Sequence, residues 1–208
     1  MEKKKDRLDL TENLFIGKGA HKAVYRHPHN TDLCVKLIYS EPDVDLEREL
    51  HYRKVRDIRN QASALLPRYY GTVATNQGTG YIFERVCDYD GMNSITLKDY
   101  LSNPPPINLC LLQSEIVNLL KRFKGQWFQE KIVTSDVDPA NFLVQKLSAV
   151  EKQIRIVDNI GTPVLIPLAF YFDYFADKRF KRYWRRFVDR LAREYPDVVT
   201  DSIVEKLL

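Results

Sequence analysis

The most informative segment of the chain reads Ile132-Val133-Thr134-Ser135-Asp136-Val137-Asp138-Pro139-Ala140-Asn141-Phe142-Leu143-Val144. It carries two carboxylates and an amide in a short loop between apolar runs, which predict two buried strand-like pieces. Asp136 and Asn141 lie five residues apart. At this spacing a carboxylate can accept a hydroxyl proton while an amide oxygen binds a magnesium ion. The alternative is a structural turn built on Asp-x-Asp-Pro.

A second acidic segment reads Ile154-Arg155-Ile156-Val157-Asp158-Asn159-Ile160-Gly161. Asp158 ends an apolar strand and a glycine follows shortly after it, so a hairpin here would present a second metal carboxylate. Magnesium prefers oxygen ligands and shares them with nucleotide phosphates. If the two apolar runs pair as strands, Asp158 and Asn141 converge on one site.

Glycines mark the first strand pair. Gly17-Lys18-Gly19 separates two strand-like runs, and glycines in such a hairpin let backbone N–H groups approach a phosphate. For so short a motif, a plain tight turn is the alternative.

Lys36 interrupts the apolar run Cys34-Val35-Lys36-Leu37-Ile38. It is either a solvent-facing lysine on an edge strand or a lysine that reaches into a cleft to bind phosphates. Two short strands and a turn separate Lys36 from Gly19. This spacing returns the lysine beneath the glycine hairpin and favours the cleft.

A lysine in a cleft needs a carboxylate partner, and the next helix offers Glu47 and Glu49. Residues two positions apart on a helix point in different directions, so at most one of them can face Lys36. We favour Glu49, and Glu47 remains the alternative.

The remaining elements follow the order of a mixed α+β chain. We expect a three-strand meander up to Tyr39, a hairpin of 69–75 with 81–86, and helices beginning near Pro42 or Asp43, near Thr96, near Asn108 and after Pro167. The apolar stripe of the first helix should consist of Leu46, Leu50, Val55 and Ile58.

This order, with the loop residues above, is typical of the bilobal protein-kinase-like fold. Asp136 and Asn141 keep the spacing of the kinase pattern H-R-D-x-x-x-x-N. Lys22 stands where a kinase loop has its third glycine, and its side chain could contact phosphate instead. We therefore expect one α+β domain over 1–208. A small antiparallel sheet with one helix forms its N-terminal lobe (about 10–90), and a shortened, mainly helical C-terminal lobe follows (91–208).

The chain also resembles a particular family. The motifs that carry the likeness are Gly-Lys-Gly-x-His-Lys-x-Val-Tyr from Gly17, Cys-Val-Lys-Leu-Ile-Tyr from Cys34, Glu-Arg-Glu-Leu-x-Tyr from Glu47, Gly-Thr-Gly-Tyr from Gly78, Asp-Pro-Ala-Asn from Asp138 and Val-Asp-Asn-Ile-Gly from Val157. Together they look like the small bacterial YrbL family, the PhoP regulatory network proteins. The likeness runs from about Leu14 to Phe187.

The resemblance implies a kinase-like fold with an ATP·Mg²⁺ site. The family's name ties it to a two-component response to low magnesium, which describes regulation and no reaction. The roles it implies are phosphate contact for Lys36, support of Lys36 by Glu49, general base for Asp136, Mg²⁺ ligation by Asn141 and Asp158, and nucleotide contact for Gly17, Gly19 and Lys22.

Several residues depart from the kinase pattern. Thr134-Ser135 replace the His-Arg pair, and Asp138 stands where many protein kinases carry a phosphate-side lysine, so it could compete with Asp136 as the base. Asp158-Asn159-Ile160-Gly161 has one residue more than Asp-Phe-Gly and lacks the phenylalanine. Only fifty residues follow Asp158, without an A-P-E-like segment, so we do not expect a full protein-kinase substrate lobe.

A strongly basic segment lies near the end of the chain. It has eight Lys/Arg between Lys178 and Arg193, with Phe180, Trp184, Phe187, Val188 and Leu191 at helical spacing. We interpret these as a core-facing apolar stripe with a solvated basic back. The alternative is a platform for an anionic substrate, anionic lipid or nucleic acid. The excess of Lys+Arg over Asp+Glu is only 32 − 28 = 4, so we do not expect nucleic acid as a partner.

The cysteines and the N-terminus indicate the compartment. Cys34, Cys87 and Cys110 are far apart and predict buried free thiols in a reducing environment. We do not expect the charged start to act as a signal peptide, and no apolar run approaches the length of a membrane span. We expect a cytoplasmic protein without a transmembrane segment.

From these features we expect an ATP·Mg²⁺-dependent phosphotransferase that acts on an unidentified hydroxyl-bearing or anionic acceptor. The alternative is a pseudokinase, a nucleotide-binding regulatory protein without turnover. The missing third glycine, the altered Asp-Phe-Gly and the short tail favour that alternative.

Overall fold

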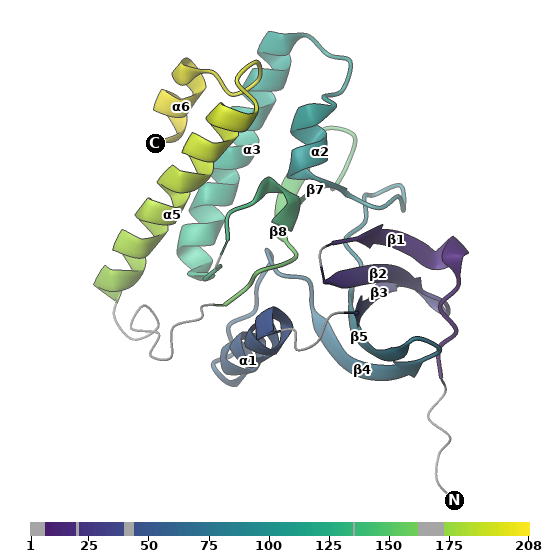
Figure 1. The fold of residues 1–208 in the computed structure, drawn as a ribbon. Helices are drawn as coiled ribbons and strands as arrows, with labels where there is room; N and C mark the ends of the chain where they lie inside the picture. Colours follow the sequence, from purple (N-terminus) through teal and green to yellow (C-terminus); the bar gives the residue numbers. More distant parts are fainter. Residues whose placement is uncertain (1–6, 20, 40–43, 135, 162–172) are drawn as a thin grey trace, which may run out of the picture.

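The computed structural model describes residues 7–19, 21–39, 44–134, 136–161 and 173–208, with side chains of the last long helix from residue 180 onward. Within them the chain forms a mixed α+β fold (Figure 1). A five-stranded antiparallel sheet makes up most of the N-terminal half. In the C-terminal half, helices pack around a three-stranded sheet.

The N-terminal sheet has the strand order β1-β2-β3-β5-β4, with all neighbours antiparallel. Its strands are β1 (Phe15–Lys18), β2 (Lys22–His27), β3 (Asn30–Ile38), β4 (Tyr69–Thr75) and β5 (Gly78–Glu84), and a short 3₁₀ turn, η1 (Glu12–Leu14), precedes them. The predicted meander and hairpin are present. Lys36 pairs with Val24 on one side and with Tyr81 on the other, so it lies on the central strand and not on an edge.

Helix α1 (Val44–Ile58) connects β3 to β4 and presents a partly polar face to the protein. Its buried residues are Leu46, Glu49, Tyr52, Arg53 and Arg56. The predicted apolar stripe is therefore wrong at Ile58, which is 74% exposed. The last turns instead direct arginines inward, where Arg56 donates a hydrogen bond to the Glu130 carbonyl at 2.9 Å.

The C-terminal half is built from the antiparallel strands β6 (Ile95–Thr96), β7 (Phe142–Lys146) and β8 (Lys152–Ile156), the helices α2 (Leu97–Ser102), α3 (Leu109–Glu130), α5 (Asp173–Glu194) and α6 (Asp201–Leu207), and the 3₁₀ turn η2 (Pro139–Asn141). The strand predicted at Ile132-Val133 is absent, and the chain makes only an isolated bridge between Thr134 and Ile160. β6 and α6 were not predicted, because elements this short carry no clear periodicity.

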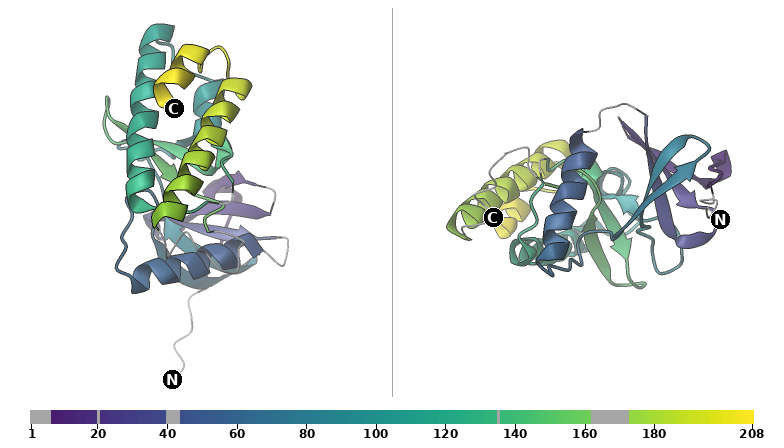
Figure 2. Two further views of the ribbon diagram at one scale, coloured as in Figure 1. Left: turned by 90° about the vertical axis from the view of Figure 1, so that its left-hand side faces the viewer. Right: turned by 90° about the horizontal axis from the view of Figure 1, so that it is seen from below.

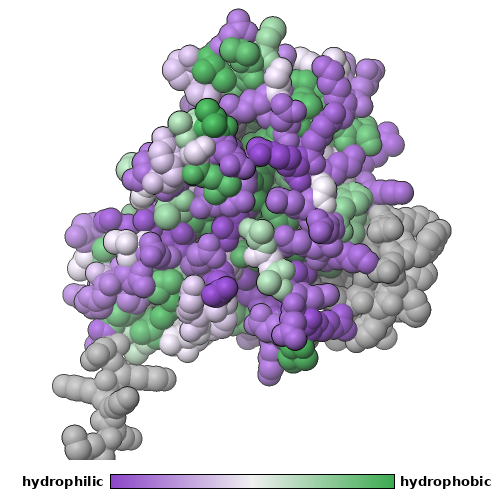
Figure 3. All heavy atoms as spheres, turned by 180° about the vertical axis from the view of Figure 1, so that it is seen from behind, coloured by the Kyte–Doolittle hydropathy of each residue, from purple (hydrophilic) through white to green (hydrophobic). Residues whose placement is uncertain are grey.

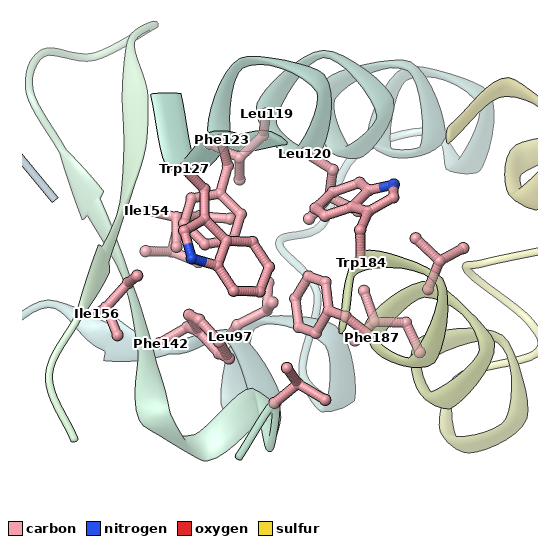
Figure 4. Packing of buried hydrophobic residues seen from close by; sticks show 14 of the residues in the cluster. Leu97, Leu119, Leu120, Phe123, Trp127, Phe142, Ile154, Ile156, Trp184 and Phe187 are labelled. Atoms are coloured by element: carbon pink, nitrogen blue, oxygen red, sulfur yellow. The ribbon is translucent and has the colours of Figure 1, made fainter. Parts of the chain in front are cut away.

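Helices α3 and α5 lie side by side over the small sheet (Figures 1 and 2), and an aromatic cluster fills the space between them (Figure 4). The cluster consists of Phe123 and Trp127 from α3, Phe142 from β7, and Trp184 and Phe187 from α5. The predicted apolar stripe of the last helix, from Phe180 to Leu191, is buried as expected. The apolar side of the basic segment therefore packs into the core.

The three cysteines are free thiols in different surroundings. Cys34 is buried, and burial raises the pKa of its thiol to about 11. Cys110 is exposed, so the prediction of buried thiols is wrong there. It lies in the first turn of α3, on the side that faces solvent.

The surface is mostly polar. The rear face of the molecule shows hydrophilic residues with small groups of hydrophobic residues scattered between them (Figure 3). Among the residues that the structure describes, no helix combines the length and apolar character that crossing a bilayer requires.

Candidate active site

A pocket of about 580 Å³ lies between the five-stranded sheet and the C-terminal half. Apolar side chains line one part of it, among them Ile16, Val24, Cys34, Val86 and Leu143. The polar part contains Gly17, Gly19, Lys22, Lys36, Asn141 and Asp158. Six of the eight residues singled out from the sequence thus border one pocket. Glu49 and Asp136 do not line it.

Lys36 reaches from the central strand toward the C-terminal half. Its ammonium donates a hydrogen bond to the Val157 carbonyl at 2.8 Å, lies 3.9 Å from Glu49 Oε2, and is 4.4 Å from the centre of the Phe83 ring. The residue is only 8% exposed. A buried ammonium needs such partners, because removing its charge from water is costly.

Glu49, and not Glu47, lies beside Lys36. Glu49 is buried, whereas Glu47 is exposed. Its closest partner is Arg53, whose Nε and Nη2 donate to Glu49 Oε1 at 2.8 and 2.6 Å. Glu49 Oε2 is buried and has no hydrogen-bond partner among the described residues. The sequence offered one signal for Arg53, its i,i+4 spacing from Glu49.

Lys22 and Asp158 form an ion pair at the polar part of the pocket. Lys22 Nζ lies 2.7 Å from Asp158 Oδ1, which also accepts the Asn159 amide at 2.9 Å. Burial alone would raise the pKa of Asp158. The positive charges of Lys36 and Lys22, with the hydrogen bonds from Lys22 and Asn159, outweigh burial and lower that pKa below its ordinary value.

The lowered pKa of Asp158 predicts a stability that depends on pH. In the unfolded chain an aspartate has a pKa of about 3.9. In the folded state the Asp158 carboxyl binds its proton less tightly than in the unfolded chain. Ionised Asp158 therefore stabilises the fold above about pH 4, and this contribution to stability is lost as pH falls through the folded-state pKa. We compare the unfolding free energy of wild type with that of Asp158→Asn. We expect the difference between them to be constant from about pH 7 to 5. Below about pH 5 the wild type should lose stability relative to the variant.

Urea unfolding at several pH values measures this difference. Lys22→Met should flatten the same part of the wild-type profile, because it removes one of the two cations that lower the pKa. A difference that stays constant down to pH 3 would contradict the ion pairing of Asp158.

The loop of Asp136 to Asn141 is organised by Asp138. Asp138 Oδ1 accepts the Ala140 amide at 2.9 Å and so caps η2, and its carbonyl accepts the Asn141 amide at 2.9 Å. β7 and β8 pair as predicted, with Phe142 opposite Ile156, and this register brings Asn141 beside the segment that carries Asp158.

Thr134 links this loop to the Asp158 segment. Its hydroxyl is 2.8 Å from the carbonyl oxygens of both Asp136 and Asn159, and it can donate to one of them at a time. The turn after Asp158 contains Gly161 at φ +96°, where a Cβ would come within 3.0 Å of Arg48 Cγ. The sequence showed Thr134 only as a departure from the kinase pattern; its bridging position depends on the tertiary fold.

Asp136 borders the site from outside the pocket. Its Oδ2 lies 3.4 Å from Asn141 Nδ2, and its side chain is 47% exposed. Arg190 of α5 lies 3.7 Å from Asp136 Oδ1 and 2.5 Å from Asp138 Oδ2. Nothing in the sequence distinguished Arg190 from the other basic residues of its helix.

The sequence model of the family described as "PhoP regulatory network protein YrbL" matches residues 8–192. The chain belongs to the YrbL family. The protein named "Uncharacterized protein YrbL" of Escherichia coli (strain K12) is 34% identical over 189 residues, which cover 88% of this chain and 87% of that protein. The protein of the same name from Shigella flexneri has the same identity and coverage. The YrbL match includes both halves and all the residues around the pocket.

Proposed function

We propose that this YrbL-family chain has a bilobal protein-kinase-like fold and acts as an ATP·Mg²⁺-dependent phosphotransferase on a hydroxyl acceptor. The observation that carries the proposal is one pocket whose lining includes Lys22, Lys36, Asn141, Asp158 and the glycine hairpin. The five-stranded sheet with α1 corresponds to the small lobe, and the helical half to a shortened large lobe.

The apolar part of the pocket suits a flat aromatic base. Ile16 and Val24 from the N-terminal sheet and Leu143 from β7 line it, together with Cys34 and Val86. Glu84, Arg85 and Val86, at the end of β5 and just after it, line the same space. Ligand pockets commonly combine such apolar walls with a few polar groups that fix orientation.

The polar part suits phosphates. Lys22 and Lys36 bring two ammonium groups to it. A Cβ added at Gly17 would meet no atom within 4 Å, and at Gly19 the nearest would be 3.9 Å away. The fold itself therefore leaves room at this hairpin, which favours close approach of a ligand to the backbone.

The donor set also fits Mg²⁺. Asn141 and Asp158 offer oxygen ligands, and Lys22 shows that the Asp158 carboxylate accepts a cation at 2.7 Å. Among the described residues no group of three or more His, Cys, Asp or Glu forms a metal cluster. Mg²⁺ is often held by one or two protein ligands and completes its shell with phosphates and water, so Asn141 and Asp158 would suffice. When bound, Mg²⁺ would neutralise phosphate charge.

In the proposed reaction Asp136 accepts the proton of the acceptor hydroxyl. The acceptor oxygen forms a bond to the γ-phosphorus while the bond from that phosphorus to the β,γ-bridging oxygen breaks, and ADP leaves. Asp136 is favoured over Asp138 as the base. Both oxygens of Asp138 are engaged, by the Ala140 amide and by Arg190, whereas Asp136 has only longer contacts and is more exposed.

A second candidate function is nucleotide binding without turnover. Three polar groups of the site already have partners inside the protein: Lys36 donates to Val157, Asp158 is paired with Lys22, and Glu49 with Arg53. A scaffold with such internal pairs could bind nucleotide as a regulatory module.

Nucleotide binding is common to both candidates and is tested by thermal unfolding. At a hundredfold excess over Kd, a ligand that binds only the folded state stabilises it by about 2.7 kcal/mol. For a chain of this size that raises Tm by about 5–10 °C. We expect ATP with Mg²⁺ to produce a shift of this order, and Lys36→Met and Asp158→Ala each to reduce it strongly.

Lys54→Ala is the matched control, because Lys54 is an exposed lysine of α1. It should leave the shift unchanged. A well-folded sample that shows no shift at millimolar ATP and Mg²⁺ would refute both candidates.

A further inference from the structure

Unlike the solvent-exposed basic residues of α5, Arg190 lies against the loop of Asp136 to Asn141. Its Nη2 is 2.5 Å from Asp138 Oδ2, its Nη1 3.7 Å from Asp136 Oδ1, and its Nε 2.8 Å from Glu194 Oε1. One guanidinium thus contacts three carboxylates. Its planar fork of donors allows this, which the compact ammonium of a lysine would not.

On the loop side, Arg190 completes the role of Asp138. One oxygen of Asp138 caps η2 through the Ala140 amide, and the other is held by Arg190. The carboxylate therefore ties the turn between Asp136 and Asn141 to the last long helix. Hydrogen bonds between charged partners are the stronger kind, so this tie restrains the loop.

On the helix side, Arg190 is presented by a rigid element. Phe187, Val188 and Leu191 are fully buried on the same helix. The ring of Phe187 lies 5.1 Å from that of Phe142, the residue next to Asn141 (Figure 4). Groups fixed by packed elements hold their geometry better than groups carried by loops alone.

We propose that Arg190 is a positioning residue for the phosphoryl transfer. It fixes Asp138 and thereby holds Asp136 and Asn141 in place. It also places a positive charge beside the carboxylates of Asp136 and Asp138, which would otherwise repel each other and an incoming phosphate. The chain has Asp138 where many protein kinases carry a lysine, and Arg190 supplies the cation from α5 instead. This proposal rests on the proposed function.

The first test separates turnover from binding in Arg190→Met. A catalytic group displaced by about 1 Å can lose about a hundredfold in rate, so we expect turnover to fall tenfold to a hundredfold. The ATP·Mg²⁺ melting shift should fall much less than turnover, because Arg190 does not line the pocket and reaches the proposed Mg²⁺ ligand Asn141 indirectly, through Asp138. Arg190→Lys should recover part of the loss, since it keeps the charge but not the fork.

Arg186→Met is the matched control, because Arg186 is exposed one turn earlier on the same helix. It should leave turnover and binding unchanged. The proposal is overturned if Arg190→Met costs no more turnover than Arg186→Met. It is equally overturned if Arg190→Met loses the melting shift in parallel with turnover, which would indicate general damage.

A second test does not need turnover. The amides of Ala140 and Asn141 both donate to Asp138, so their hydrogen exchange reports whether the loop is held. We expect Arg190→Met to speed exchange at these two amides by on the order of tenfold, with no change for the amides of β8. Asp138→Asn should have a similar effect, and the double variant little more than either single one, because the two residues act together.

Unchanged exchange at Ala140 and Asn141 in Arg190→Met overturns the proposal, whatever the activity. If wild-type protein binds ATP·Mg²⁺ without turnover, the proposed transferase function fails while the exchange result still decides the role of Arg190 in the loop. The two failures are therefore distinguishable.

Discussion

Asp136→Asn is expected to lower phosphoryl transfer or ATP hydrolysis by on the order of a hundredfold or more while leaving ATP·Mg²⁺ binding nearly intact. A general base acts mainly in the transition state, so its removal affects kcat and not the affinity of the ground state. The position of Asp136 is consistent with an effect on turnover and not on binding. Asp136 does not line the pocket, and its carboxylate lies next to the lining residue Asn141. Single-turnover kinetics and the melting shift measure the two effects.

Asp138→Asn is the matched comparison, since it removes the neighbouring carboxylate. We expect a smaller loss, because in the proposed reaction Asp136 is the base, while Asp138 contacts the Ala140 amide and Arg190 and restrains the loop. Turnover that survives Asp136→Asn but disappears in Asp138→Asn would show that the base is Asp138. Wild-type protein that binds ATP·Mg²⁺ but turns over with neither water nor any hydroxyl acceptor would favour the regulatory candidate.

Phe187→Ala is expected to destabilise the protein by about 3–5 kcal/mol. The side chain is fully buried and its ring lies within 5.1 to 6.2 Å of the rings of Phe142, Trp184 and Phe123. Truncation leaves a cavity that these large neighbours cannot close without leaving their own positions. A loss of this size is a large fraction of the stability of a typical domain.

Urea unfolding at neutral pH measures this loss. Lys181→Ala, at an exposed position of the same helix, should change the unfolding free energy by no more than about 0.5 kcal/mol. A loss below about 1 kcal/mol for Phe187→Ala would contradict the packing of α5 against the aromatic cluster.

Most of the fold could be predicted from local patterns. Apolar, β-branched and aromatic runs bounded by turn residues predicted the five strands of the N-terminal sheet, and the 3.6-residue repeat predicted α3 and the buried face of α5. These patterns work because an element that buries one face must repeat its apolar residues with its own period. The prediction was wrong at Ile58, where two buried arginines of α1 replace the apolar contacts that the pattern assumed.

For the candidate site, the sequence by itself determined which side chains are available and, through short-range geometry, where some of them lie. Lys36 follows the glycine hairpin by two strands, and Asp138 caps the turn that leads to Asn141; both depend on residues near in sequence. The tertiary structure alone decided which residues hold them. Arg190 lies 52 residues from Asp138, Lys22 lies 136 from Asp158, and Lys36 lies 121 from Val157. Such pairs form only when whole helices and sheets have packed, because hydrophobic burial is non-directional and leaves no periodic mark on the polar residues that it brings together.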